Sequence, residues 1–160
     1  RSFSQAVHIN GRDLLLIDDT YNSNPDSMKV AIDSLSEMAE PRLVVMGDMG
    51  EVGEQGLAFH AEAGEYAQNK GIQQLFVLGE LSREAVKHFK GAQHFETIDA
   101  LLTAVSNTVG DVNSILVKGS RFMKMERVSA HILALAAPDR STPNSNTINE
   151  NNKKEANHVA

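Results

Sequence analysis

The chain has 160 residues, 41% of them hydrophobic, which is enough to build one α/β domain around a sizeable core. Fifteen basic and 21 acidic side chains leave a formal charge of −6. This balance argues against a nucleic acid held by a general phosphate field, although it allows a small anion bound by a few local donors. There is no cysteine, which excludes disulfides, thiol nucleophiles and thiolate metal sites.

The two ends of the sequence differ from its middle. It begins with Arg1 rather than Met, and strand-like residues follow at once, so we expect a piece of a longer protein. There is no apolar run of transmembrane length and no signal-peptide pattern, which predicts a cytoplasmic protein without a membrane partner. From about Pro138 the composition changes to Ser, Thr, Asn, Lys and Glu. We therefore expect one domain over residues 1–137 and a disordered tail over residues 138–160.

The first predicted elements are two strands and a helix. Residues 5–9 alternate as a strand, and Asn10-Gly11 is a strong hairpin signal, so this strand should lie antiparallel to the buried strand at 14–17. A polar turn then leads to a helix over about 25–39. Asn24 suits its N-cap, and a proline suits its first position.

Strands and helices alternate through the rest of the chain. Further strands are predicted at 43–46, 75–78, 92–95 and 114–117, each followed by a helix. The inward residues of two of these helices are expected to be Leu57, Ala61, Gly64 and Ala67, and Phe122, Met125, Val128, Ile132 and Leu135. The pattern predicts a three-layer α/β/α, Rossmann-like fold with a mostly parallel six-stranded sheet and one antiparallel N-terminal strand.

Three polar turns each follow a predicted strand, and we expect them on a single edge of the sheet. In open α/β sheets, ligands bind at the carboxyl ends of strands. The turn at 118–121 combines two cations and a hydroxyl with a predicted helix N-terminus. Backbone amides and a bidentate guanidinium suit a carboxylate or a phosphate. A plain surface loop with two solvated cations is an equal alternative.

The acids and the tyrosine in the other two turns also have two interpretations each. Asp18 and Asp19 can bind ribose hydroxyls or an amine, or one of them can simply cap the turn or the helix. Tyr21 can stack on a ring, although covering the edge of the core is favoured. Asp48 and Glu51 can reach a metal or a substrate amine, although acids in a loop are more often solvated.

Nucleotide-phosphate and metal signatures are missing from the sequence. There is neither GxGxxG nor GxxxxGK[ST], and the glycine-rich turn at 47–53 fits neither pattern. If this domain contacts a nucleotide, it therefore does not hold the phosphates in a classical glycine loop of its own. None of the six histidines has a second metal ligand at a suitable spacing. We expect all six to be structural or surface residues, and we assign no metal ligand.

Taken together, three motifs resemble the C-terminal domain of the Mur ligases. They are Asp18-Asp19-Thr20-Tyr21-Asn22-Ser23-Asn24-Pro25, Gly47-Asp48-Met49-Gly50-Glu51-Val52-Gly53 and Val117-Lys118-Gly119-Ser120-Arg121. Their order, spacing and positions after strands agree with the family over about residues 14–136, and Ser23 stands where the family commonly has Ala. Within the family, the chain is most similar to the ligases that use D-Ala-D-Ala.

This resemblance implies an ATP- and Mg²⁺-dependent ligase that joins D-Ala-D-Ala to UDP-N-acetylmuramoyl-tripeptide through an acyl phosphate in peptidoglycan synthesis. It also implies N-terminal UDP-sugar and central ATPase domains, absent from this chain, of which the second holds the P-loop and the magnesium sites. This domain would then close over the centre and position substrates, with its own other two domains as partners. On its own it would be inactive.

The resemblance also implies two groups of site residues, neither of them catalytic or metal-binding. The nucleotide side would comprise Asp19, Tyr21, Asn22 and Asn24. The dipeptide side would comprise Lys118, Gly119, Ser120 and Arg121, with Asp48 and Glu51 on the same rim. A stand-alone α/β module that binds a small anion at 118–121 is the alternative function, and a dehydrogenase nucleotide domain is a weaker third because its glycine pattern is missing.

Overall fold

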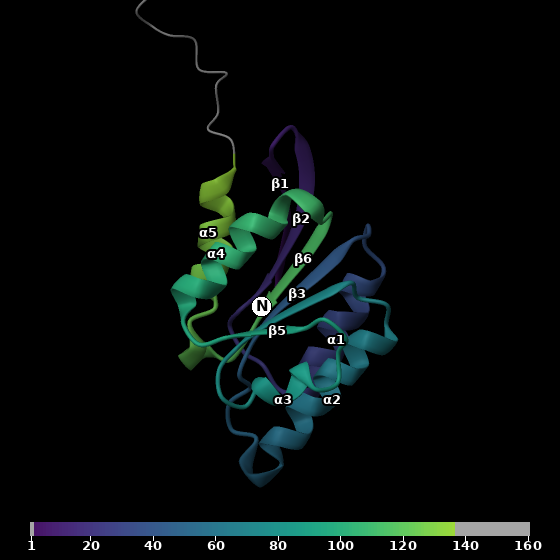
Figure 1. Cartoon of the computed structure of the whole chain (residues 1–160), viewed down its shortest axis with the longest axis vertical. Coiled ribbons are helices and arrows are strands. Elements are labelled where there is room, and N and C mark those ends of the chain that lie inside the picture. Colours follow the sequence, from purple (N-terminus) through teal and green to yellow (C-terminus); the bar gives the residue numbers. More distant parts are fainter. Residues whose placement is uncertain (1, 137–160) are drawn as a thin grey trace, which may run out of the picture.

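The computed structural model describes residues 2–136 and contains a six-stranded sheet in the order β1-β2-β6-β3-β4-β5 (Figure 1). The strands are β1 (Phe3–Ile9), β2 (Arg12–Asp19), β3 (Arg42–Gly47), β4 (Gln74–Leu78), β5 (Gln93–Phe95) and β6 (Ser114–Lys118). The α-helices are α1 (Pro25–Ser36), α2 (Gly56–Asn69), α3 (Arg83–Val86), α4 (Ile98–Thr108) and α5 (Glu126–Leu135). Within this part of the chain, no helix is both long enough and apolar enough to cross a membrane.

The N-terminal hairpin is confirmed. β1 pairs antiparallel with β2 so that Ile9 faces Arg12 across the Asn10-Gly11 turn. Both turn residues have positive φ, 53° and 79°, as the tight turn that matches the twist of two antiparallel strands requires. All other strand pairs in the sheet are parallel, which confirms the predicted fold class.

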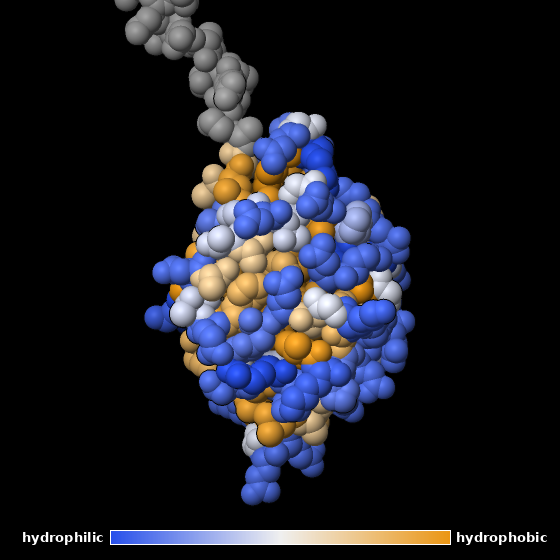
Figure 2. Space-filling model, in the orientation of Figure 1, coloured by the Kyte–Doolittle hydropathy of each residue, from blue (hydrophilic) through white to orange (hydrophobic). Residues whose placement is uncertain are grey.

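Helices cover both faces of the sheet and enclose two separate apolar cores. α4 and α5 pack over one core, which includes Leu16, Leu101 and Ile132. On the opposite face, α1, α2 and α3 pack over a second core, which includes Met28 and Ala67 (Figure 1). Polar residues dominate the face seen in Figure 2, with apolar residues gathered in smaller patches between them.

Two predicted helix faces need correction. α2 starts at Gly56 after a 3₁₀ turn, so its buried side carries His60 and Ala63 as well as the predicted Gly64 and Ala67. This phase leaves Leu57 50% exposed, and Ala61 is only partly buried.

The last helix also begins later than predicted. Phe122 belongs to a separate 3₁₀ turn (Arg121–Met123) and is 62% exposed. Lys124 then adopts the left-handed conformation (φ 51°), which interrupts helical hydrogen bonding before α5 begins at Glu126. The turn at 118–121 therefore does not run directly into an α-helix N-terminus. α1 ends at Ser36 rather than near residue 39, and the tail predicted for 138–160 lies outside the described residues.

Candidate functional site

The three polar turns lie together at one edge of the sheet. β6 is the central strand between β2 and β3, and Lys118 at its end is in register with Asp19 on β2 and with Met46 on β3. Since these three strands are parallel, the turns that follow them emerge side by side. The expectation that they share an edge is confirmed.

Lys118 is a buried cation that connects the first turn to the last. Its side chain is 1% exposed, and its ammonium donates to Asp19 Oδ2 at 2.9 Å and to the carbonyl oxygen of Asn22 at 2.8 Å. The structure therefore joins two residues that the resemblance assigned to different ligands. The alternative of a solvated surface cation is wrong for Lys118.

Ser120 connects all three turns. Its backbone N–H donates to the carbonyl oxygen of Asp48 at 3.1 Å, and its hydroxyl donates to the carbonyl oxygen of Ser23 at 3.3 Å. The same hydroxyl accepts a hydrogen bond from the backbone N–H of Gly50. A Cβ at the neighbouring Gly119 would collide with Met125, so close packing requires glycine there.

Asp48 is buried and acts within the fold. Its carboxylate accepts from the backbone N–H of Ser82 at 2.8 Å and of Leu81 at 3.2 Å, at the start of α3. At 7% exposure it is not the solvated loop acid that was the favoured alternative. Glu51, by contrast, is exposed and has a positive φ of 54°, which is uncommon for a residue other than glycine.

The remaining polar residues of the first turn shape its backbone. Asn24 caps α1 by accepting from Ser27 N–H, and Asn22 Oδ1 accepts from Ser23 N–H at 2.9 Å. Asp18 accepts from the Thr20 hydroxyl at 2.7 Å. Neither Asp18 nor Asp19 caps α1, because Asn24 does so.

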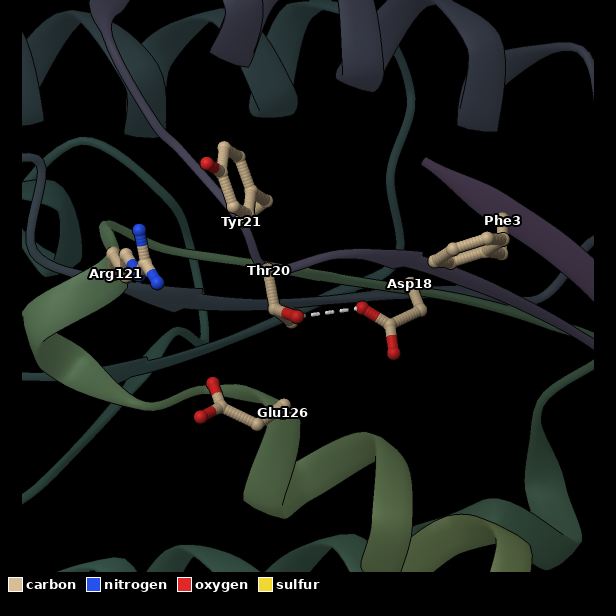
Figure 3. A pocket seen from close by; sticks show the side chains of 6 residues that line it. All are labelled: Phe3, Asp18, Thr20, Tyr21, Arg121 and Glu126. Atoms are coloured by element: carbon tan, nitrogen blue, oxygen red, sulfur yellow. Dashed lines mark hydrogen bonds between the residues drawn. The ribbon is translucent and has the colours of Figure 1, made fainter. Parts of the chain in front are cut away.

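A cavity of about 680 Å³ opens beside the first turn (Figure 3). It is lined by Phe3, Asp18, Thr20, Tyr21, Arg121 and Glu126. The Arg121 guanidinium lies 5.2 Å from the centre of the Tyr21 ring, within range of a cation–π contact. Tyr21 is 60% exposed, so the favoured interpretation that it covers the core edge is wrong.

Arg121 also lines a second cavity, of about 450 Å³. Its lining comes from all three turns and comprises Asn22, Gly50, Glu51, Ser120, Arg121 and Phe122. Arg121 thus lines both cavities and is their shared cation. Of the ten predicted site residues, Tyr21, Asn22, Glu51, Ser120 and Arg121 line a cavity, whereas Asp19, Asn24, Asp48, Lys118 and Gly119 support the turns behind it.

Five residues that line the cavities were missed as site residues: Phe3, Thr20, Gly50, Phe122 and Glu126. Phe3 pairs with Asp18 across the hairpin, so counting the register back from Asn10-Gly11 would have placed it beside the first turn. Thr20 lies inside a motif already singled out. Glu126 had no usable signal, because its position depends on the interruption at Lys124.

Among residues 2–136, no group of three or more His, Asp or Glu side chains is arranged to hold a metal ion. His60 is fully buried in α2, and its two ring nitrogens both have backbone partners. His94 and His131 also make hydrogen bonds within the fold.

Comparison with known sequences identifies the family. A family described as "Mur ligase, glutamate ligase domain" matches residues 5–121. The UDP-N-acetylmuramoyl-tripeptide–D-alanyl-D-alanine ligases of Buchnera aphidicola (subspecies Acyrthosiphon pisum) and Escherichia coli are 40% and 39% identical to this chain over 116 residues. These matches cover 71% of this chain and 26% of either relative, so the chain spans about a quarter of their length.

Solved structures agree with this assignment. A crystal structure of MurF from Acinetobacter baumannii matches with a TM-score of 0.72 and 29% identity, covering 84% of this chain and 29% of that one. MurF ligase from Thermotoga maritima, solved in complex with ADP, has a TM-score of 0.70 over 82% of this chain and 30% of that one, but at 23% identity it supports the fold alone. The chain therefore belongs to the Mur ligase family and corresponds to its C-terminal, glutamate ligase domain.

Proposed function

We propose that this chain is the closing domain of an ATP-dependent ligase that adds D-Ala-D-Ala to UDP-N-acetylmuramoyl-tripeptide in peptidoglycan synthesis. Its relatives over 71% of its length carry that name. The chemistry that ATP supplies in this proposal is activation of the tripeptide carboxylate as an acyl phosphate. The residues of this chain bind and orient the dipeptide and contact the nucleoside, while domains outside this chain hold the phosphates and Mg²⁺.

The charge pattern around Arg121 carries this proposal. Arg121, Asp18 and Glu126 line the same cavity, and Figure 3 shows their side chains around a common space. A dipeptide is a zwitterion, so its carboxylate suits the guanidinium and its amine suits a carboxylate. Phe3 offers apolar surface for a methyl side chain. An isolated inorganic anion would be repelled by both acids, which disfavours the stand-alone anion-binding module.

The nucleoside part of ATP also fits this edge of the sheet. Tyr21 presents an exposed ring beside the hydroxyl of Thr20, and such a ring can stack on a base. Asn22 and Asn24 already form hydrogen bonds next to the turn, and Asp19 accepts from Lys118, so in this proposal they act mainly by fixing the backbone of the turn next to the nucleoside. The described residues offer no three-ligand metal group, and we assign no step through Mg²⁺ to them.

On the dipeptide side, too, some residues would contact the substrate and others would hold the turns in place. Arg121 would bind the substrate carboxylate directly, with Glu51 on the rim of the neighbouring cavity. Three residues would support the site without contacting the dipeptide, because their polar groups already hold the turns together: Lys118, Ser120 and Asp48. Closure of the domain would then bring the amine of the bound dipeptide towards the activated carboxylate of the tripeptide.

The proposal is tested with a chimeric ligase in which this chain replaces the corresponding quarter of the Escherichia coli relative. We expect release of phosphate from ATP only when UDP-N-acetylmuramoyl-tripeptide and D-Ala-D-Ala are both present. The 160-residue chain alone should release none. A chimera that folds, binds ATP and never responds to D-Ala-D-Ala would contradict the proposed function.

A further inference from the structure

His60 is a fully buried polar group outside the cavities, and the proposed chemistry does not use it. Its side chain is fully buried within α2. The ring Nε2 accepts a hydrogen bond from the backbone N–H of Met49 at 2.9 Å, and Nδ1 lies 2.6 Å from the carbonyl oxygen of Gly56. An N–H can only donate and a carbonyl can only accept, so the ring carries its hydrogen on Nδ1.

The Met49 amide lies at the start of the turn that forms the second cavity. The next N–H along the chain, that of Gly50, donates to the Ser120 hydroxyl, and that hydroxyl donates to the carbonyl oxygen of Ser23. The imidazole of His60 thus holds the Met49 amide, and the backbone connects that amide to Gly50, whose hydrogen bond with Ser120 leads to the other two turns. The side chain of Met49 is itself fully buried, which fixes this peptide from a second direction.

The turn held in this way has little regular structure of its own. No helix or strand covers residues 48–52, and Glu51 adopts a left-handed backbone conformation. Gly50 approaches its neighbours closely, since a Cβ there would lie 3.0 Å from Phe122 and 3.2 Å from the Ser120 hydroxyl. A turn that combines backbone strain with close contacts must be held by its surroundings.

We propose that His60 is a positioning residue that sets the place of Gly50 and Glu51 on the rim of the second cavity. It acts through the Met49 peptide and needs no contact with any ligand. The inference goes beyond the proposed function, because it rests only on contacts within the chain. A merely structural histidine would stabilise α2 and the core but would leave the turn no more mobile than the rest of the fold.

Two substitutions separate these roles in the 160-residue chain. The amide oxygen and nitrogen of glutamine are as many bonds from Cβ as Nε2 of histidine, so His60→Gln retains a polar atom at that position. Those of asparagine are as many bonds from Cβ as Nδ1, so His60→Asn retains a polar atom there instead. We expect His60→Asn to accelerate amide hydrogen exchange of Met49 and Gly50 about tenfold relative to a core amide such as Leu116. In His60→Gln the same ratio should rise less than about threefold, because an acceptor for Met49 remains.

Equal effects of the two substitutions on this ratio, or exchange of the turn in proportion to Leu116, would overturn the proposal. Ser120→Ala tests the same connection from the other end and does not disturb α2. It should accelerate exchange of Gly50 about tenfold while Met49 stays protected by His60. Loss of the protection of Met49 in Ser120→Ala, with His60 intact, would likewise overturn the proposal.

Discussion

At the scale of single residues, Lys118 shows how a charged side chain can serve the site from behind. Its ammonium is buried against Asp19, whose side chain is 18% exposed. We predict that Lys118→Met lowers the free energy of unfolding by about 3 kcal/mol, because it leaves a largely buried carboxylate unpaired. Denaturant unfolding measures this loss.

The double mutant Lys118→Met/Asp19→Asn provides the control for this pair. Removing both charges should cost clearly less than the sum of the two single substitutions, since no unpaired charge remains. If the costs are additive, the ion pair does not couple the two turns, and our account of Lys118 is wrong.

Ser23 is a buried residue whose hydroxyl finds no hydrogen-bond partner within residues 2–136, at 2% exposure. We predict that Ser23→Ala leaves the free energy of unfolding unchanged or raises it by about 1 kcal/mol, because a buried, unpaired hydroxyl is removed. Ser114→Ala is the matched control. Its fully buried hydroxyl donates to the carbonyl oxygen of Ala39 at 2.8 Å, so this change should cost about 1 kcal/mol. Equal losses in the two variants would refute the prediction.

These residues also mark the limit of sequence-based prediction at this scale. The sequence identified Lys118, Asp19 and Asp48 as chemically notable, since each follows an apolar strand. It did not reveal that Lys118 pairs with Asp19, or that Asp48 accepts from two amides near α3. Partners of this kind come from different strands and depend on sheet order, which local patterns do not encode.

At the scale of elements, the close contact between α2 and α3 depends on a glycine, which has no side chain. A Cβ at Gly64 would overlap the backbone of Ala85 in α3. We predict that Gly64→Ala destabilises the fold by about 2 kcal/mol, although alanine favours a helix more than glycine does by about 1 kcal/mol. Thermal unfolding of Gly64→Ala measures this destabilisation. Ala61→Gly in the same helix measures the effect of helix propensity alone. Stabilisation by Gly64→Ala would show that the two helices can separate freely.

A polar cluster connects α1 to α2 on the surface. The Tyr66 hydroxyl donates to Asp33 at 2.5 Å and the Lys70 ammonium lies 3.1 Å from the same oxygen, and these two contacts lower the pKa of Asp33 below its usual value. The carboxyl group of Asp33 therefore binds its proton more tightly in the unfolded chain than in the folded protein. The stabilisation is present above about pH 4 and is lost as the pH falls through the lowered pKa.

Comparison of the wild type with Asp33→Asn between pH 2 and 7 tests this linkage. The difference in unfolding free energy should be constant near neutral pH and should narrow in acid, where Asp33 is protonated in both folded and unfolded chains. The effect should be small, since both charged side chains are nearly half exposed. A difference that widens as the pH falls would contradict the direction of the pKa shift.

At the scale of the whole molecule, the fold could be predicted from the sequence because its signals are local and repeated. Apolar runs alternating with amphipathic stretches define a parallel sheet, and Asn10-Gly11 defines the one antiparallel pair. The failures occurred where backbone conformation changes between elements. The left-handed residue Lys124 separates Phe122 from α5, and no periodicity of apolar residues reveals such a break.

The position of the site could be predicted from the sequence, but the full set of residues that line its cavities could not. The three motifs were expected at one edge and are found there. The cavities, however, also use Phe3 from the neighbouring strand and Glu126 from the start of α5. In the proposed function, Arg121, which lines both cavities, binds the carboxylate of the dipeptide.

Steady-state kinetics of Arg121→Ala in the chimeric ligase test this claim most directly. We predict that KM for D-Ala-D-Ala rises at least about tenfold, because a charge-assisted bidentate contact is lost. KM for ATP should change by less than about threefold. Lys124→Gln, which removes a nearby exposed cation that lines neither cavity, should leave both constants close to those of the parent chimera. A selective rise in KM for ATP would contradict the account, since it would place Arg121 on the nucleotide instead.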